Sequence, residues 1–286
     1  MSNLLSMKSF AKRMNDLTFT DYYTRLSLLA KSVFKWENLP NHIDEKWIEK
    51  FLFRDGKCVF YEDETKGLMI AECVQNGELN NYEEPTEISP CGIGIEHKVL
   101  TPGVDCVLIR NNDEMIPTKH PVKLFAYRLA EISRTIDINV NAQKTPVLIL
   151  TSEKGKLTVK NIYAQWSGNE PVITGDKNID PEMFKVLKTD APIVFPQLQV
   201  YKHDMWNECL TFLGINNANT EKRERLITDE VTANNEHIDL SAECFLKSRQ
   251  RAVEEINRIF GTEIKVSLRK ECEEECQQSI LNYSEI

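Results

Sequence analysis

The chain has 286 residues and a mass of 33.0 kDa, enough to bury one large core or two modest ones. Hydrophobic residues make up 41% and charged residues 28%, which argues against a disordered chain. The longest uninterrupted run of apolar residues has four members, which argues against a membrane-spanning helix. With 35 Lys and Arg against 44 Asp and Glu, the net charge is −9, and the basic excess typical of a free-standing duplex-DNA binder is missing.

Apolar residues spaced three and four apart predict four helices, over residues 18–33, 122–136, 198–213 and 245–260. Gly261 directly follows the last of them, where glycine commonly ends a helix. Three β-prone runs between the first two helices predict a small antiparallel barrel or sandwich: 57–61, 68–71 and 104–109. Further runs predict strands at 145–150, 157–159, 171–174 and 264–268. The expected class is α+β.

Motifs for catalysis or metal binding are weak. Cys272 and Cys276 would share a helix face, but two thiols do not complete a zinc site, so we expect no metal and no cofactor. The segment 91–95 contains a GxG without a third glycine and is predicted to be a loop. Eight dispersed cysteines favour reduced thiols in a cytosolic setting, and the N-terminus does not resemble a cleaved signal peptide. The sequence does not predict an enzyme.

The segment 217–234 is unusual because it is long, mixed in charge and poor in large apolar residues. It lies between two predicted helices. Long loops of this kind in compact domains are usually functional or mobile.

This segment and its flanks resemble the portal protein (upper collar, or head–tail connector) of small short-tailed φ29-like podophages of the picovirus group. The blocks that carry the resemblance are FKWENLP (34–40), NAQKTPVLI (141–149), KTDAP (188–192), WNE (206–208), TFLGI (211–215), TDEV (228–231) and FLKSR (245–249). They occur in the family's order over about three-quarters of the chain. The region from about Cys58 to Pro117 matches mainly by position.

The resemblance implies a phage portal fold with long stem helices, a β-rich wing and a small β-containing clip, assembled as a ring. The implied parts are an N-terminal arm (1–17), the wing (18–119, a helix plus a small β barrel), a stem helix (120–143), the clip (144–196), a second stem helix (197–216), a tunnel loop (217–234), and a wing-completing helix, strand and acidic tail (235–286).

The resemblance also implies a DNA tunnel. Lys188 and Lys222 match tunnel lysines of the family, Arg223 keeps the charge of another, and Gln197 replaces a further one. The other residues that we place along the tunnel are Glu221, Arg225, Asp229 and Glu230. For the contact between subunits we single out Met205 and Trp206, although core residues would look the same in sequence.

The implied partners are eleven further copies in a ring of about twelve, double-stranded DNA, capsid and scaffolding proteins, the packaging ATPase and the lower collar or tail. The place would be the head–tail junction of the virion, reached from the host cytoplasm during assembly. A packaging RNA is not supported, since Lys8, Lys12 and Arg13 are the only basic residues in the first twenty. Two alternatives remain: an adaptor or lower collar ring protein, and a nucleic-acid-processing enzyme using two metal ions held by carboxylates, Asp229 and Glu230 among them.

Overall fold

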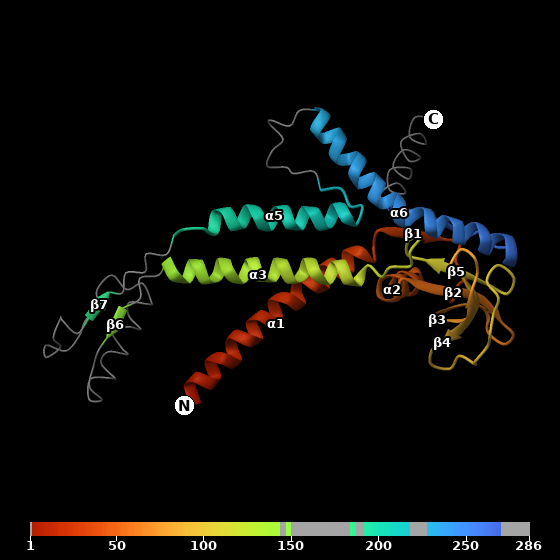
Figure 1. Cartoon of the computed structure of the whole chain (residues 1–286), viewed down its shortest axis with the longest axis horizontal. Coiled ribbons are helices and arrows are strands. Elements are labelled where there is room, and N and C mark those ends of the chain that lie inside the picture. The colour runs from red at the N-terminus through yellow and green to blue at the C-terminus, as the bar shows by residue number, and fades with distance from the viewer. Residues whose placement is uncertain (1, 144–146, 150–183, 187–191, 218–227, 270–286) are drawn as a thin grey trace, which may run out of the picture. The chain divides into compact units, whose positions relative to one another are not determined.

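The computed structural model describes residues 2–143, 147–149, 184–186, 192–217 and 228–269 (Figure 1). The chain divides into two compact units, one made of Met1–Glu131 with Lys202–Ile286 and the other of Ile132–Tyr201. Long helices and short antiparallel strands form the mixed helix-and-sheet fold that the sequence predicts. The helices are α1 (Ser2–Ala30), α2 (Glu45–Asp55), α3 (Lys119–Gln143), α5 (Phe195–Phe212) and α6 (Thr228–Phe260).

The four predicted helices are confirmed as α1, α3, α5 and α6, and each begins earlier than predicted, α1 and α6 by much more than α3 and α5. Helix α1 starts at Ser2 rather than near Thr18, so it includes the stretch expected to be a separate arm. That stretch is free of Gly and Pro and contains good helix formers such as Leu, Met, Lys and Ala. Helix-forming residues therefore continue the helix beyond the range of its apolar periodicity.

Helix α2 was not predicted, although the sequence contains the signals for it. Asp44 is the N-cap and its carboxylate accepts a hydrogen bond from the amide of Lys46. Gly56 ends the helix in the left-handed conformation, and its amide donates to the carbonyl of Leu52. Between the caps, Ile48 and Leu52 are fully buried. Two caps around an i, i+4 apolar pair would have indicated this helix.

A four-stranded antiparallel sheet follows α2, in the order β4-β3-β2-β5. Its strands are β2 (Lys57–Asp63), β3 (Gly67–Leu79), β4 (Pro85–Cys91) and β5 (Cys106–Arg110). The predicted runs at 57–61, 68–71 and 104–109 are confirmed as β2, β3 and β5. Strand β4 was missed because prolines at its first and sixth positions read as a loop. Its place at the edge of the sheet is where strand prolines are tolerated.

In place of the expected small antiparallel barrel or sandwich, the structure has a four-stranded sheet with an incomplete closure. The segment 100–102 makes a single bridge to each edge strand, Ile88↔Leu100 to β4 and Pro102↔Cys106 to β5. The edges of the sheet therefore approach each other through isolated bridges rather than a continuous ladder.

Both faces of this sheet are buried, because alternate residues of a strand point to opposite faces. On β2 and β5, Cys58, Phe60, Val107 and Ile109 join a cluster with α2, α6 and a second small sheet. The intervening residues pack on the other face, in a cluster of Val59, Tyr61, Ala71, Ile88, Cys106 and Leu108. The alternation explains why these strands read as nearly continuous apolar runs.

The second small sheet pairs β1 (Phe34–Glu37) with β8 (Lys265–Leu268). It confirms the strand predicted at 264–268 and shows that the FKWENLP block begins as a strand. A third pair, β6 (Val147–Ile149) with β7 (Phe184–Val186), belongs to the smaller unit and confirms part of the strand predicted at 145–150. The strands predicted at 157–159 and 171–174 lie outside the described residues.

Candidate DNA-tunnel and subunit-contact residues

Most of the predicted tunnel residues, namely Lys188, Glu221, Lys222, Arg223 and Arg225, lie outside the described residues. The predicted tunnel loop is too long at its C-terminal end, because α6 begins at Thr228 rather than after residue 234. Asp229 and Glu230 therefore belong to the first turn of a helix. The sequence of this turn suits a helix start, because Asp and Glu are generally favourable in the first turn of a helix.

The two predicted subunit-contact residues lie on α5 and contact their own chain. The side chain of Met205 is 5% exposed. Trp206 is partly buried, and its ring lies 6.4 Å from that of Tyr22 on α1. The guanidinium of Arg25 sits 4.7 Å from the Tyr22 ring and 5.6 Å from the Trp206 ring. Of the two residues, Trp206 is the more exposed in the single chain.

Aromatic contacts connect the long helices within the larger unit. Phe19 of α1 stacks on Tyr127 of α3 with ring centroids 4.2 Å apart. Phe212, at the end of α5, lies 6.3 Å from Phe125 of α3 and meets Phe245 of α6 edge-on at 5.8 Å. Such pairs add to the free energy of apolar burial. These contacts join α5 to α3 and α6.

In the smaller unit, Asn139 connects α3 to the beginning of α5. Its side chain is 9% exposed. The amide nitrogen donates to the carbonyl of Pro192 over 2.9 Å, and the amide oxygen accepts from the backbone N–H groups of Val194 and Phe195, both at 3.2 Å. Since the first N–H groups of a helix have no partner within the helix, Asn139 of one helix caps the other.

Several large apolar side chains are also exposed among the described residues of the smaller unit. Those of α3 are Ile138 and Val140, with 64% and 43% exposed. Those at the start of α5 are Ile193, Phe195, Val200 and Tyr201. Exposed apolar groups gathered on neighbouring segments are a feature of surfaces that bind another protein.

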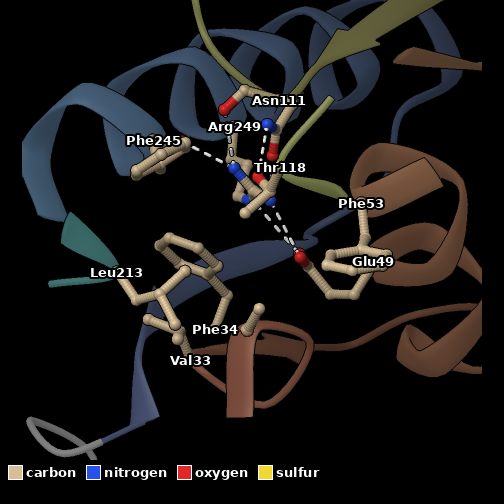
Figure 2. Close-up of a pocket in the computed structure, with 10 residues that line it drawn as sticks. Val33, Phe34, Glu49, Phe53, Asn111, Thr118, Leu213, Phe245 and Arg249 are labelled. Carbon is tan, nitrogen blue, oxygen red and sulfur yellow. Dashed lines mark hydrogen bonds and ion pairs between the residues drawn. The ribbon is translucent and has the colours of Figure 1, made fainter. Parts of the chain in front are cut away.

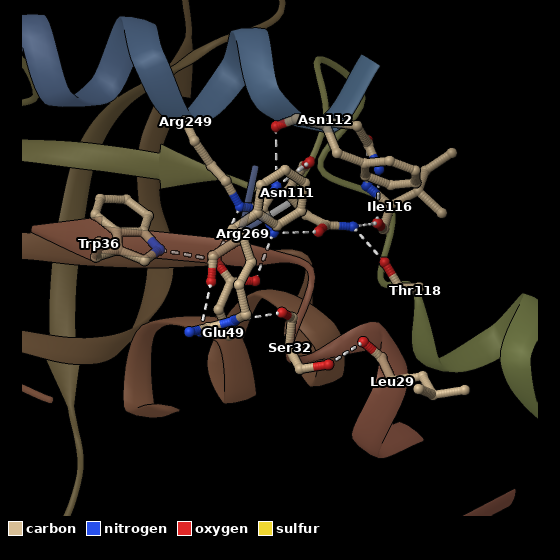
Figure 3. A network of polar contacts seen from close by, with 12 residues as sticks. Leu29, Ser32, Trp36, Glu49, Asn111, Asn112, Ile116, Thr118, Arg249 and Arg269 are labelled. Atoms are coloured by element: carbon tan, nitrogen blue, oxygen red, sulfur yellow. Dashed lines mark hydrogen bonds and ion pairs between the residues drawn. The ribbon is translucent and has the colours of Figure 1, made fainter. Parts of the chain in front are cut away.

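A buried ion pair in the larger unit brings the resemblance blocks together (Figure 3). Arg249 of the FLKSR block and Glu49 of α2 are each 2% exposed. The Nε and Nη2 groups of Arg249 donate to the two carboxylate oxygens of Glu49 over 2.9 and 2.8 Å. The Trp36 indole of the FKWENLP block donates to the same carboxylate, and the guanidinium lies 4.0 Å from the Phe34 ring. Bidentate geometry and full hydrogen bonding are what such a pair needs in order to be buried.

The remaining hydrogen bonds of Arg249 run to the backbone of Asn111 and Phe245 and, from Nη2 over 3.2 Å, to the side-chain oxygen of Asn111. Its Nη1 group donates to the carbonyls of Asn111 and Phe245 over 3.0 and 2.9 Å. The Asn111 side chain in turn donates to the Ile116 carbonyl and to the Thr118 hydroxyl, immediately before α3. Figure 2 shows the small cavity beside this network, with a volume of about 10 Å³, the space of a single water. The network thus fixes α2, α6 and the segment leading into α3.

Sequence reasoning missed this network. Arg249 lies four residues after Phe245 and three before Ala252, on the apolar stripe of its helix. A charged residue at such a position is a signal for a buried pair. The partner at position 49 has no comparable signal.

The family model of the Phage Connector (GP10) matches residues 5–273. The chain belongs to the phage connector family. It is similar to a chain of the portal and tail of native bacteriophage P68, with 15% identity, 91% of this chain and 89% of that chain covered, and a TM-score of 0.49. It is also similar to a chain in the virion of a native gene transfer agent particle, with 8% identity, coverage of 87% and 79%, and a TM-score of 0.44. The predicted resemblance to connectors is confirmed at the level of the family.

In the described part of this connector, no helix is long and apolar enough to cross a membrane. The same ranges contain no group of three or more His, Cys, Asp or Glu side chains placed to hold a metal ion. The alternative metal site at Asp229 and Glu230 lies outside the side chains that the structure describes.

The cysteines of the connector that fall in the described ranges are free thiols. Burial raises the pKa of Cys73, Cys106 and Cys209 to about 12. At neutral pH these side chains are therefore uncharged and weakly nucleophilic, and they act as small apolar groups in the core.

Proposed function

We propose that this chain is the portal, or upper collar, subunit of a short-tailed φ29-like phage. Membership of the phage connector family over residues 5–273 carries the proposal. About twelve copies would form a ring at one capsid vertex, through which double-stranded DNA enters during packaging and leaves at ejection. The ring would contact capsid and scaffolding proteins, then the packaging ATPase, and later the lower collar and tail. Its role would be structural, without catalysis.

The exposed apolar side chains of residues 132–201 support assembly into a ring. A closed ring of identical subunits needs two different complementary surfaces on each copy. Helices packed side by side offer such surfaces, and Ile138 of α3 and Val200 of α5 are 64% and 62% exposed in the single chain. We propose that these two helices form the stem and that such side chains are covered by neighbouring subunits.

The charge of the chain fits a conduit better than a DNA clamp. Twelve copies at −9 each would give a ring charge near −108. Each phosphate neutralised by a basic residue strengthens binding by releasing counterions, so a strongly basic wall would hold the duplex in place. A mostly acidic ring with a few basic positions, proposed here as Lys188, Lys222 and Arg223, would let DNA slide.

Assembly is tested directly by electron microscopy and native mass determination of the full chain over a range of concentrations. We expect rings with a central hole and a mass near twelve times 33.0 kDa. A uniform monomer or dimer at every concentration would contradict the portal proposal.

The sliding argument is tested with a triple variant, Lys188→Ala, Lys222→Ala and Arg223→Ala, in assembled rings. We expect the salt dependence of DNA association to become shallower while packaging continues. The charge-preserving variant Lys188→Arg, Lys222→Arg and Arg223→Lys should behave like the wild type. Complete loss of packaging in the alanine variant alone would show that these charges are essential.

A further inference from the structure

The turn between β3 and β4 displays two large apolar side chains that its own chain leaves uncovered. Tyr82 is 85% exposed and Leu79 is 59% exposed. The turn is nevertheless well fixed, because the side-chain oxygen of Asn80 accepts from the amides of Tyr82 and Glu84 over 2.8 and 3.0 Å. The backbone of Asn80 bonds that of Glu84 and Glu83 as well. A rigid turn that presents an exposed tyrosine has already lost the entropy that binding would otherwise cost.

A pocket of about 230 Å³ lies between α2 and the beginning of β3. It is mostly apolar and aromatic, lined by His42, Ile43, Trp47, Phe51, Met69 and Ile70. Trp47 is 43% exposed there, although tryptophan is a residue that folded chains usually cover. We name this cavity, with its six lining residues, the Trp47 pocket. Its volume suits one aromatic side chain.

The turn and the pocket lie at opposite ends of the same strand. Ile70 lines the pocket near the start of β3, and Leu79 is the last residue of that strand. At about 3.3 Å per residue the two are roughly 30 Å apart along the strand. Because both belong to one sheet, a chain cannot insert its own turn into its own pocket. A second copy can.

The charges around the two surfaces are opposite in sign. Residues 78–84 include Glu78, Glu83 and Glu84 and lack basic residues. The ammonium groups of Lys46 and Lys50 lie 5.5 and 4.8 Å from the ring of Trp47. Lys46 pairs with Asp44 and Glu84 with Arg110. Neither Lys50 nor Glu83 forms an ion pair with any residue that the structure describes.

We call residues 79–84, the end of β3 and the turn after it, the Tyr82 turn. We infer that the Tyr82 turn of one subunit docks in the Trp47 pocket of a second copy of this chain, with Glu83 against Lys50. The contact joins two different surfaces and is therefore heterologous, as a closed ring requires. The inference rests on the proposed ring and names one of its subunit contacts. An aromatic side chain buried in a pocket and surrounded by charges is the usual composition of an interface hot spot.

The test compares ring formation by full-length variants over a range of protein concentrations, with native mass determination as the readout. Tyr82→Ala and Lys50→Glu should each raise the concentration needed for rings by about tenfold or more. Since Tyr82 is exposed in the single chain, its removal should leave thermal unfolding of the monomer unchanged. The matched control is Ile93→Ala, which removes a fully exposed isoleucine from the 91–95 loop that follows β4. We expect this variant to assemble like the wild type.

Charge reversal tests whether Glu83 and Lys50 of two subunits meet. Glu83→Lys should weaken assembly, and the combination Glu83→Lys with Lys50→Glu should restore it, because every subunit carries both surfaces. Two results would overturn this contact and leave the portal proposal intact, provided that the wild-type chain forms rings. In the first, Tyr82→Ala assembles as well as the wild type. In the second, the two single charge variants assemble weakly and the double variant does not restore assembly. A wild-type chain that never forms rings would overturn both.

Discussion

Replacing Arg249 with Met is expected to lower the free energy of unfolding by about 3–5 kcal/mol. Glu49 would remain 2% exposed without its counter-charge, keeping only the hydrogen bond from the Trp36 indole. The carbonyls of Asn111 and Phe245 would also lose a donor. Urea denaturation of the full chain, followed by tryptophan fluorescence, measures the change.

Two further variants separate the buried pair from charge in general. Arg251→Ala removes an arginine two residues away whose ion pair with Asp113 is exposed, and it should cost less than about 1 kcal/mol. The double variant Arg249→Met with Glu49→Leu should recover part of the loss, because no unpaired charge stays buried. If Arg249→Met were as mild as Arg251→Ala, the network would not stabilise this core.

Replacing Gly56 with Ala is expected to cost about 2–5 kcal/mol, from strain in the backbone and from a steric clash. Gly56 adopts φ 77° at the end of α2. A Cβ there would lie 1.9 Å from the carbonyl oxygen of Met115 and 2.7 Å from its carbonyl carbon. Both are backbone atoms, so the turn between α2 and β2 or the 111–117 segment would have to move.

Gly67 provides the matched control for this clash. It has a similar φ of 73°, but nothing lies within 4 Å of the position where a Cβ would stand. Gly67→Ala should therefore cost only about 1–2 kcal/mol for the left-handed backbone. The difference between the two denaturation midpoints measures the close approach of Gly56 to Met115. Equal losses would show that the segment around Met115 yields without cost.

The elements that could be read from the sequence are those whose signals are local. Helices α3 and α5 follow from apolar residues three and four apart, and β2 follows from a short β-prone run. Asp44 and Gly56 would have indicated α2 by the same kind of reasoning. The local signal of β4 argues against a strand, because prolines are tolerated in a strand only at the edge of a sheet. That β4 lies at an edge follows only from the sheet order, in which it pairs with β3 alone among the named strands.

The candidate sites divide in the same way. The family resemblance of short blocks could be read from the sequence, and it predicted the connector family. The tertiary structure alone decided that Glu49 pairs with Arg249, which is 200 residues away, and that the Tyr82 turn and the Trp47 pocket lie at opposite ends of one strand. Propensity and periodicity depend on neighbours within one or two turns of a helix, whereas burial and pairing depend on which distant segments fold against each other. For that physical reason the sequence by itself determined the family and the elements with local signals, and the fold decided strand β4 and the distant contacts.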